Sequence, residues 1–145
     1  FAGEIIPAYE GFNFTVSAKA GLIVQCKTNL PDGTALSVGL WQRSPKKFLY
    51  EGMPLDYPKN FDTLVNDGAV AATFPTAYVK GLPAGNYDVS ISIIQLQRNA
   101  PLGEKNSLLS GPEVKTLENG YKEHTAMFPV KIAKAIPPHP KKLPE

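Results

Sequence analysis

The stretch Tyr87-Asp88-Val89-Ser90-Ile91-Ser92-Ile93 alternates apolar and polar side chains, and it decides the fold class. Successive side chains of an extended strand point to opposite faces, so a period of two buries one face only. The turn Leu82-Pro83-Ala84-Gly85-Asn86 leads into this strand, which we expect to continue to Leu96. The consecutive Ile93-Ile94 interrupts the alternation and predicts a bulge or a change of burial there.

The same alternation recurs on both sides of this strand. Further strands are predicted at residues 12–18, 22–27, 35–41, 69–74 and 126–132. Two turn signals separate them, Pro31-Asp32-Gly33 and Asn66-Asp67-Gly68, and the first can form a hairpin or a crossover between sheets. Pro129 cannot donate to a sheet, which places the last strand at an edge or its proline at a bulge. Together these signals predict an all-β sandwich of about seven or eight strands.

The composition agrees with a sheet protein. The chain has 145 residues, enough for one domain with its own core. Its 14 Pro and 12 Gly leave little room for long helices, because proline lacks a backbone donor and glycine costs backbone entropy. The net charge is +2 with scattered lysines, which argues against nucleic-acid binding. We expect no membrane span, since no stretch approaches about 18 apolar residues.

The two ends of the chain differ from its middle. We expect an N-terminal extension at residues 1–11, a single sandwich domain at residues 12–133 and a Pro-rich C-terminal tail at residues 134–145. The first residue is Phe1 rather than Met, which favours a processed protein that is secreted or exposed at the cell surface. The tail has no amphipathic pattern, so we expect polyproline-type chain that joins no core.

Two segments carry a family resemblance. Residues 28–34, followed by Leu36, Val38 and Leu40, resemble the early hairpin of prealbumin-like surface domains, and residues 78–89 are similar to their "gLpaGtYtv" turn and strand. With residues 66–68 between them, the pattern resembles carboxypeptidase-regulatory-like and collagen-adhesin B-type domains over residues 20–96. The resemblance implies an immunoglobulin-like or transthyretin-like sandwich that spaces, stiffens or adheres at cell surfaces. We do not carry over the Lys–Asn crosslink of some adhesin repeats, since no residue matches its motif.

Few side chains point to catalysis or metal binding. Cys26 excludes an intrachain disulfide, and its apolar surroundings predict a small buried side chain, with a reactive thiol as the alternative. His124 lies in a charged segment and is expected to be solvated, and His139 lies between prolines. No pair of histidines has metal-ligand spacing, and no histidine-based triad has support. We therefore expect no enzyme, no cofactor and no metal site.

The acidic side chains are spread through predicted loops. Asp32 and Asp67 are explained by their turns, where each carboxylate can accept hydrogen bonds from nearby backbone amides. A glycosidase needs two acids that face each other in a cleft, and Glu51 or Asp56 would need such a partner. A small hydrolase is therefore the third hypothesis, behind two that involve no catalysis.

Two regions are candidates for contacts with other molecules. The aromatic residues between positions 41 and 61 could stack on sugar rings, dock a neighbour or simply close one end of the sandwich, and the candidates are Trp41, Tyr50, Tyr57 and Phe61. The chain ends could pass to a neighbouring subunit or form a plain edge strand and a tail, and their candidates are Phe12, Phe14, Val16, Pro137, Pro138 and Pro140.

These candidates lead to two hypotheses about function. The first is a non-catalytic extracellular structural module, a subunit of a surface filament, sheath or larger appendage. Its partners would be proteins, in a homo-oligomer or a larger assembly. The second is a carbohydrate-binding or adhesion module that uses Trp41, Tyr50 and Tyr57.

Overall fold

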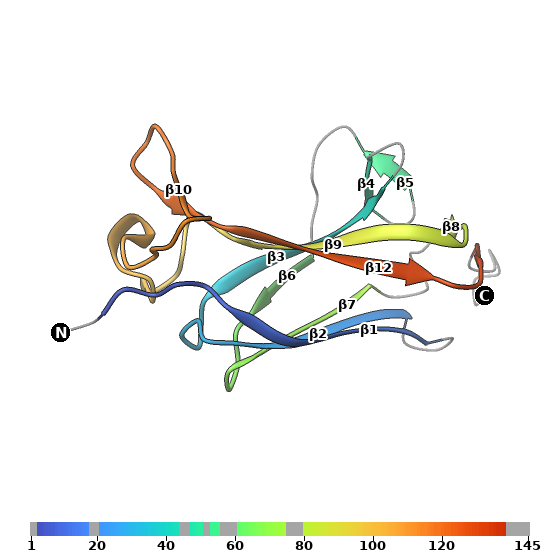
Figure 1. Ribbon diagram of the computed structural model, residues 1–145, viewed down its shortest axis with the longest axis horizontal. Coiled ribbons are helices and arrows are strands. Elements are labelled where there is room, and N and C mark those ends of the chain that lie inside the picture. The colour runs from blue at the N-terminus through green and yellow to red at the C-terminus, as the bar shows by residue number, and fades with distance from the viewer. Residues whose placement is uncertain are drawn as a thin grey trace, which may run out of the picture.

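The protein is seen here as a computed structural model, which describes residues 3–17, 21–43, 47–50, 53–55, 61–74 and 80–138. Only the backbone is described for residues 47–50, 53–55, 61, 80–81 and 136–138. Antiparallel strands make up most of this chain, and they form two sheets that face each other as layers (Figure 1). The all-β sandwich is therefore confirmed. Within the described ranges no helix is long and apolar enough to cross a membrane.

The larger sheet forms one layer of the sandwich. Its strands follow in the order β12 (Thr125–Ile132), β9 (Gly85–Ile93), β3 (Ala35–Gln42), β4 (Lys47–Tyr50) and β5 (Met53–Leu55). A further strand, β6 (Phe61–Leu64), pairs with the first half of β3, while β4 pairs with the second half. The strand β3 therefore lies in the middle of this sheet, with β9 along one side and β6 and β4 along the other.

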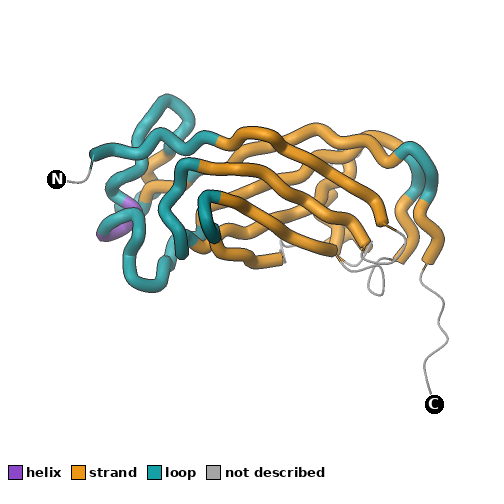
Figure 2. Tube along the Cα trace, turned by 90° about the horizontal axis from the view of Figure 1, so that it is seen from below, coloured by secondary structure: helices purple, strands orange, loops and turns teal. Residues whose placement is uncertain are grey.

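The smaller sheet and two short strand pairs complete the described fold. The smaller sheet has the order β1 (Tyr9–Ser17), β2 (Gly21–Thr28) and β7 (Ala69–Phe74). The short pairs are β10 (Lys115–Thr116) with β11 (Lys122–Glu123), and β8 (Lys80–Leu82) with β13 (Ile136–Pro138). The pair of β8 and β13 lies at one end of the sandwich, and the loops after β9 lie at the other (Figures 1 and 2).

The core lies between the two sheets, where the alternating side chains predicted from the sequence meet. Its central members are Leu22, Val24 and Cys26 in β2, Val70, Ala72 and Phe74 in β7, Leu36, Val38 and Leu40 in β3, and Tyr87, Val89, Ile91 and Ile93 in β9. The prediction for Tyr87–Ile93 is confirmed, and the hydroxyl of Tyr87 donates to the Pro83 carbonyl at 2.7 Å. The expected continuation to Leu96 is wrong, because the strand ends at Ile93, where the alternation breaks.

The two predicted turns connect different sheets. The turn before Thr34 leads from β2 to β3, so it is a crossover rather than a hairpin. At the second turn, Asn66 and Ala69 exchange two backbone hydrogen bonds of 3.0 Å each. Asp67 and Gly68 have φ values of 53° and 70°, as a two-residue hairpin turn with two positive φ angles requires. The hairpin is confirmed at its tip, beyond which β6 and β7 separate into opposite sheets.

One side of the sandwich carries the edge strands of both sheets, β1 and β12. The rings of Phe12 and Phe128 stack there with their centroids 4.3 Å apart and close the interior. A register shift between Glu10 and Asn13 interrupts β1, and Pro129 lies within β12, at the edge where its position in the sequence predicts it. The strand β1 also begins earlier than residue 12, so the end of the expected N-terminal extension belongs to the smaller sheet.

The Pro-rich tail also differs from its expectation. Residues 136–138 form β13, whose backbone pairs with β8 from Leu82 to Lys80. Pairing of a three-residue strand uses backbone groups, and it leaves no alternating side-chain pattern that the sequence could reveal. Residues 139–145, including Pro140, lie outside the described residues.

Candidate binding groove

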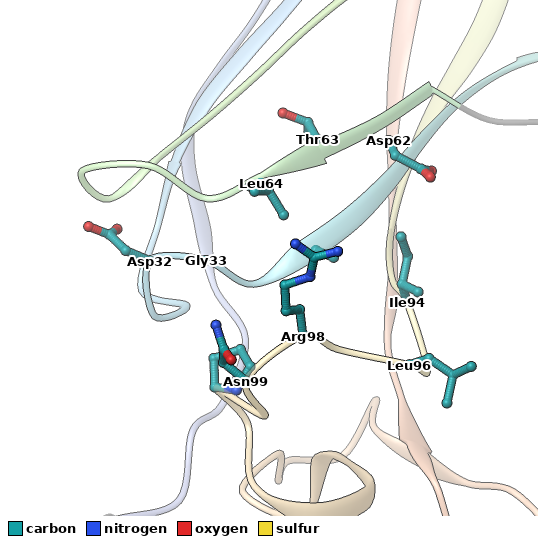
Figure 3. Close-up of a pocket in the computed structure, with 11 residues that line it drawn as sticks. Asp32, Gly33, Asp62, Thr63, Leu64, Ile94, Leu96, Arg98 and Asn99 are labelled. Atoms are coloured by element: carbon teal, nitrogen blue, oxygen red, sulfur yellow. The ribbon is translucent and has the colours of Figure 1, made fainter.

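An open groove lies where β6, the start of β3 and the loop after β9 meet (Figure 3). Its volume is about 560 Å³, within the roughly 300–1,000 Å³ of ligand-binding clefts. Both apolar and charged side chains line it, and they include Asp32, Asp62, Leu64, Ile94, Leu96 and Arg98.

The amide side chain of Gln97 fixes one wall of the groove. Its Oε1 accepts a hydrogen bond from the Ala35 amide at 2.7 Å, and its Nε2 donates to the Ala35 carbonyl at 2.9 Å. The same Nε2 also donates to the Ile94 carbonyl at 2.7 Å. A side chain thus bonds the first residue of β3 as a neighbouring strand would. The flanking residues Leu96 and Arg98 are thereby held beside β3.

Hydrogen bonds from Asn106 also hold the loop that carries Leu96 and Arg98. Asn106 is buried, and its Nδ2 lies within 3.4 Å of the carbonyl oxygens of Ile94, Gln95 and Lys122. Asn99 and Ala100 next to the groove have positive φ angles of 64° and 44°. An alanine in this region is strained, and such strain persists only where surrounding contacts enforce it. These contacts therefore fix the conformation of the loop, which forms one wall of the groove.

The turn before β3 forms another part of the groove. Asp32 Oδ1 accepts a hydrogen bond from the Gly68 amide at 3.0 Å, which joins this turn to the hairpin tip between β6 and β7. At the far end, Asp62 Oδ1 accepts from the Ser37 hydroxyl at 3.2 Å. Asp32 and Asp62 point away from each other at opposite ends of the groove (Figure 3). They therefore lack the facing arrangement that glycoside hydrolysis uses.

The groove combines exposed apolar side chains with charges of both signs. Leu64 is 59% exposed and Leu96 is 75% exposed, which leaves both leucines largely in water. Arg98 extends from the loop across the groove toward β6 (Figure 3). Within the described chain no salt bridge engages Arg98. The groove thus exposes both apolar and charged groups to solvent.

The strand predicted as an interaction segment lies partly against its own core. Phe12 and Phe14 are half-buried and pack on the hydrophobic cluster. Val16 is 47% exposed. The backbone of this strand pairs with β2 along one side. These residues lie on β1, away from the groove.

The aromatic candidates do not converge in the described chain. Trp41 is half-buried on β3, and its indole N–H donates to the Ser90 hydroxyl at 3.0 Å. Tyr50 lies in β4 and Phe61 in β6, and only the backbone of these two residues is described. Tyr57 lies outside the described residues, as do Glu51 and Asp56, the carboxylates of the hydrolase hypothesis. Pro137 and Pro138 lie in β13, at the end opposite to the groove.

His124 is the clearest correction to the sequence prediction. It is 7% exposed rather than solvated, because the Tyr9 ring stacks over it with centroids 6.2 Å apart. Its Nε2 lies 3.8 Å from Glu113 Oε1, and in the described chain its Nδ1 and the Tyr9 hydroxyl are buried without hydrogen-bond partners. Burial lowers the pKa of His124, and Glu113 opposes that shift. His124 lines a second, smaller cavity of about 270 Å³.

Leu64, Leu96 and Arg98 were not candidates on the sequence alone. Leu96 follows Ile93-Ile94 and continues the apolar run of β9, so the pattern assigns it to the strand. The groove forms because segments near positions 32, 62 and 96 meet in space, which no local pattern records. The one available signal was the broken alternation at Ile93-Ile94.

The structure of the described residues establishes the fold class of the protein, and the comparisons with known proteins add no family to it. No protein-family model matches the chain, and no curated protein or solved structure is significantly similar to it. Among the described residues, no three or more His, Cys, Asp or Glu side chains are grouped as metal ligands. The chain is thus an antiparallel all-β sandwich protein with an open amphipathic groove at one end.

Proposed function

We propose that this chain is a non-catalytic extracellular structural module that assembles through protein–protein contacts at the groove. It acts as a subunit of a surface filament, sheath or larger appendage, and its topology is immunoglobulin-like or transthyretin-like. The observation that carries the proposal is the pair of exposed leucines, Leu64 and Leu96, at a groove whose walls are fixed by hydrogen bonds.

The energetics favour an occupant of this groove. Full burial of a leucine side chain contributes about 1.5–3 kcal/mol relative to an exposed one. Because Leu64 and Leu96 are largely exposed, most of that stabilisation is absent in the isolated chain. Exposed apolar side chains that flank a cleft and are bordered by charges are a common feature of interaction sites. The charges of Asp32, Asp62 and Arg98 would select among partners.

The sheet edges favour the groove over strand addition as the place of contact. The register shift at Glu10–Asn13 and the proline at position 129 interrupt the two edge strands on the same side of the sandwich. Bulges and prolines are devices that protect an edge from pairing with another chain. On the opposite side, the hydroxyl of Thr63 donates to the Ala71 carbonyl of β7 at 2.8 Å and occupies part of that edge.

The carbohydrate-binding alternative has weaker support. The ring of Trp41 could stack on a sugar, yet its N–H group is bonded to Ser90. That donor would need to exchange partners before it could bind a sugar hydroxyl. Binding of a glycan that is lost on Trp41→Ala would support this alternative.

Sedimentation velocity over a range of protein concentrations tests the proposed assembly. We expect the mass of the wild-type chain to rise with concentration, and the double variant Leu64→Asp/Leu96→Asp to stay monomeric. Met127→Asp is the matched control, since Met127 is 40% exposed on β12 and lies outside the groove. Equal masses for the wild type and the groove variant at every concentration would refute the proposal.

A further inference from the structure

We propose that the groove of one molecule binds residues 139–145 of a second copy. This inference rests on the proposed function, because it names the partner of the same groove. The segment reads His139-Pro140-Lys141-Lys142-Leu143-Pro144-Glu145. The result is a head-to-tail contact between subunits.

The segment and the groove have complementary chemistry. Leu143 supplies an apolar side chain for the exposed surface of Leu64 and Leu96. Lys141 and Lys142 provide two positive charges for a groove that has an aspartate at each end. Glu145 provides the negative charge that matches Arg98. The segment thus carries a complementary group for each kind of side chain that lines the groove.

The prolines make the segment suitable for this kind of site. Pro140 and Pro144 favour the extended polyproline conformation. A chain that is already extended loses less conformational entropy when it binds than a flexible one does. An extended segment also fits an open groove better than a compact one does.

The geometry shows that the partner must be another molecule. The segment follows β13, which pairs with β8 at the end of the sandwich where β9 begins (Figure 1), whereas Ile94 of the groove lies just beyond the last residue of β9. The nine residues of β9 span roughly 26 Å at about 3.3 Å for each step. Leu143 follows Pro138 by five residues and reaches only about 16 Å in a polyproline conformation. Leu143 therefore cannot enter the groove of its own chain.

The contact would join opposite ends of the sandwich. Such a contact leaves an unused groove at one end of a pair and an unused segment at the other. Repeated contacts of this kind form an open filament unless the rotation between subunits closes a ring. The inferred contact is thus consistent with the proposed filament or sheath.

A synthetic peptide of residues 138–145 tests the docking step directly. The receptor is the full chain with Lys141→Glu, Lys142→Glu and Leu143→Asp, a tail variant whose own segment cannot compete. We expect saturable binding that weakens by about tenfold or more when the peptide carries Leu143→Ala. Binding should also weaken with rising salt, since it includes charge pairs. A scrambled peptide of the same composition is the control, and equal affinity for both peptides would overturn the inference.

A mixing experiment tests the head-to-tail geometry. The groove variant Leu64→Asp/Leu96→Asp keeps its tail, and the tail variant keeps its groove. Each should be monomeric alone, and an equimolar mixture should form a dimer but nothing larger, because one complementary contact survives. A mixture that stays monomeric would overturn the inference.

The same variants separate failure of this inference from failure of the proposed function. If the tail variant assembles like the wild type while the groove variant does not, assembly at the groove stands and tail docking is refuted. If both variants assemble like the wild type, both proposals are refuted. Circular dichroism of each variant verifies that the sandwich remains folded.

Discussion

Asp32 Oδ1 accepts a hydrogen bond from the Gly68 amide at 3.0 Å, although the two residues are 36 positions apart in the sequence. Two backbone hydrogen bonds reinforce this contact, from the Gly33 amide to the Val65 carbonyl and from the Val65 amide to the Thr34 carbonyl. The turn before β3 and the hairpin tip before β7 are thus tied into one unit. This unit joins the two sheets and forms one side of the groove.

Replacement of Asp32 by Ala should lower the free energy of unfolding by about 1 kcal/mol, because the Gly68 amide loses a charged acceptor but can still bond water. Chemical denaturation followed by tryptophan fluorescence measures the change. Asp67→Asn is the control, since an asparagine tolerates the positive φ at that position. An Asp32→Ala variant as stable as the control would contradict the structural role of this contact.

Replacement of Gln97 by Ala should lower the free energy of unfolding by about 1–3 kcal/mol, since partly buried groups of Ala35 lose their partner. The loop at Leu96 and Arg98 should become more mobile, which faster amide exchange at residues 94–101 would reveal. Gln97→Glu should destabilise at least as much, because a carboxylate oxygen would then face the carbonyl oxygens of Ala35 and Ile94 in place of the Nε2 donor. Arg98→Ala is the control on the same loop, and equal exchange in both alanine variants would contradict the role assigned to Gln97.

Cys26 should be unreactive in the folded protein. It is buried, and burial raises the pKa of its thiol to about 11, so the thiol remains protonated near pH 8. A disulfide reagent should label it slowly in the native state and at once in denaturant. Cys26→Ser should lower the free energy of unfolding by about 1–3 kcal/mol, because it places a hydroxyl in the apolar interior. Rapid labelling under native conditions would contradict the observed burial.

His124 should make stability depend on pH in mildly acidic solution. Burial lowers its pKa below the ordinary 6.5, so the unfolded chain takes up the proton first as the pH falls. The stability associated with neutral His124 is therefore fully present above pH 6.5 and is lost as the pH falls through the lowered pKa. Denaturation curves measured between pH 5.5 and 7.5 should show this loss in the wild type. His124→Gln should show a flatter profile, and identical profiles would refute the assignment.

Much of the fold could be predicted because local patterns match local structure. The alternation in Tyr87–Ile93 and the turn at Asn66–Gly68 both appear where the sequence predicts them. His124 was misjudged because its sequence neighbours are charged, whereas its neighbour in space is the ring of Tyr9. A pattern of neighbours along the chain carries no information about such a contact.

The sequence by itself determined the all-β class and the inward faces of the main strands, and it restricted Pro129 to an edge strand or a bulge. Each of these follows from a side-chain period or from the missing donor of one residue. Only the tertiary structure decided which strands share a sheet, that β13 pairs with β8, and that Leu64, Leu96 and Arg98 surround one groove. The physical reason is that these relationships depend on contacts between segments far apart in the chain. Such contacts arise when the two sheets close over the core.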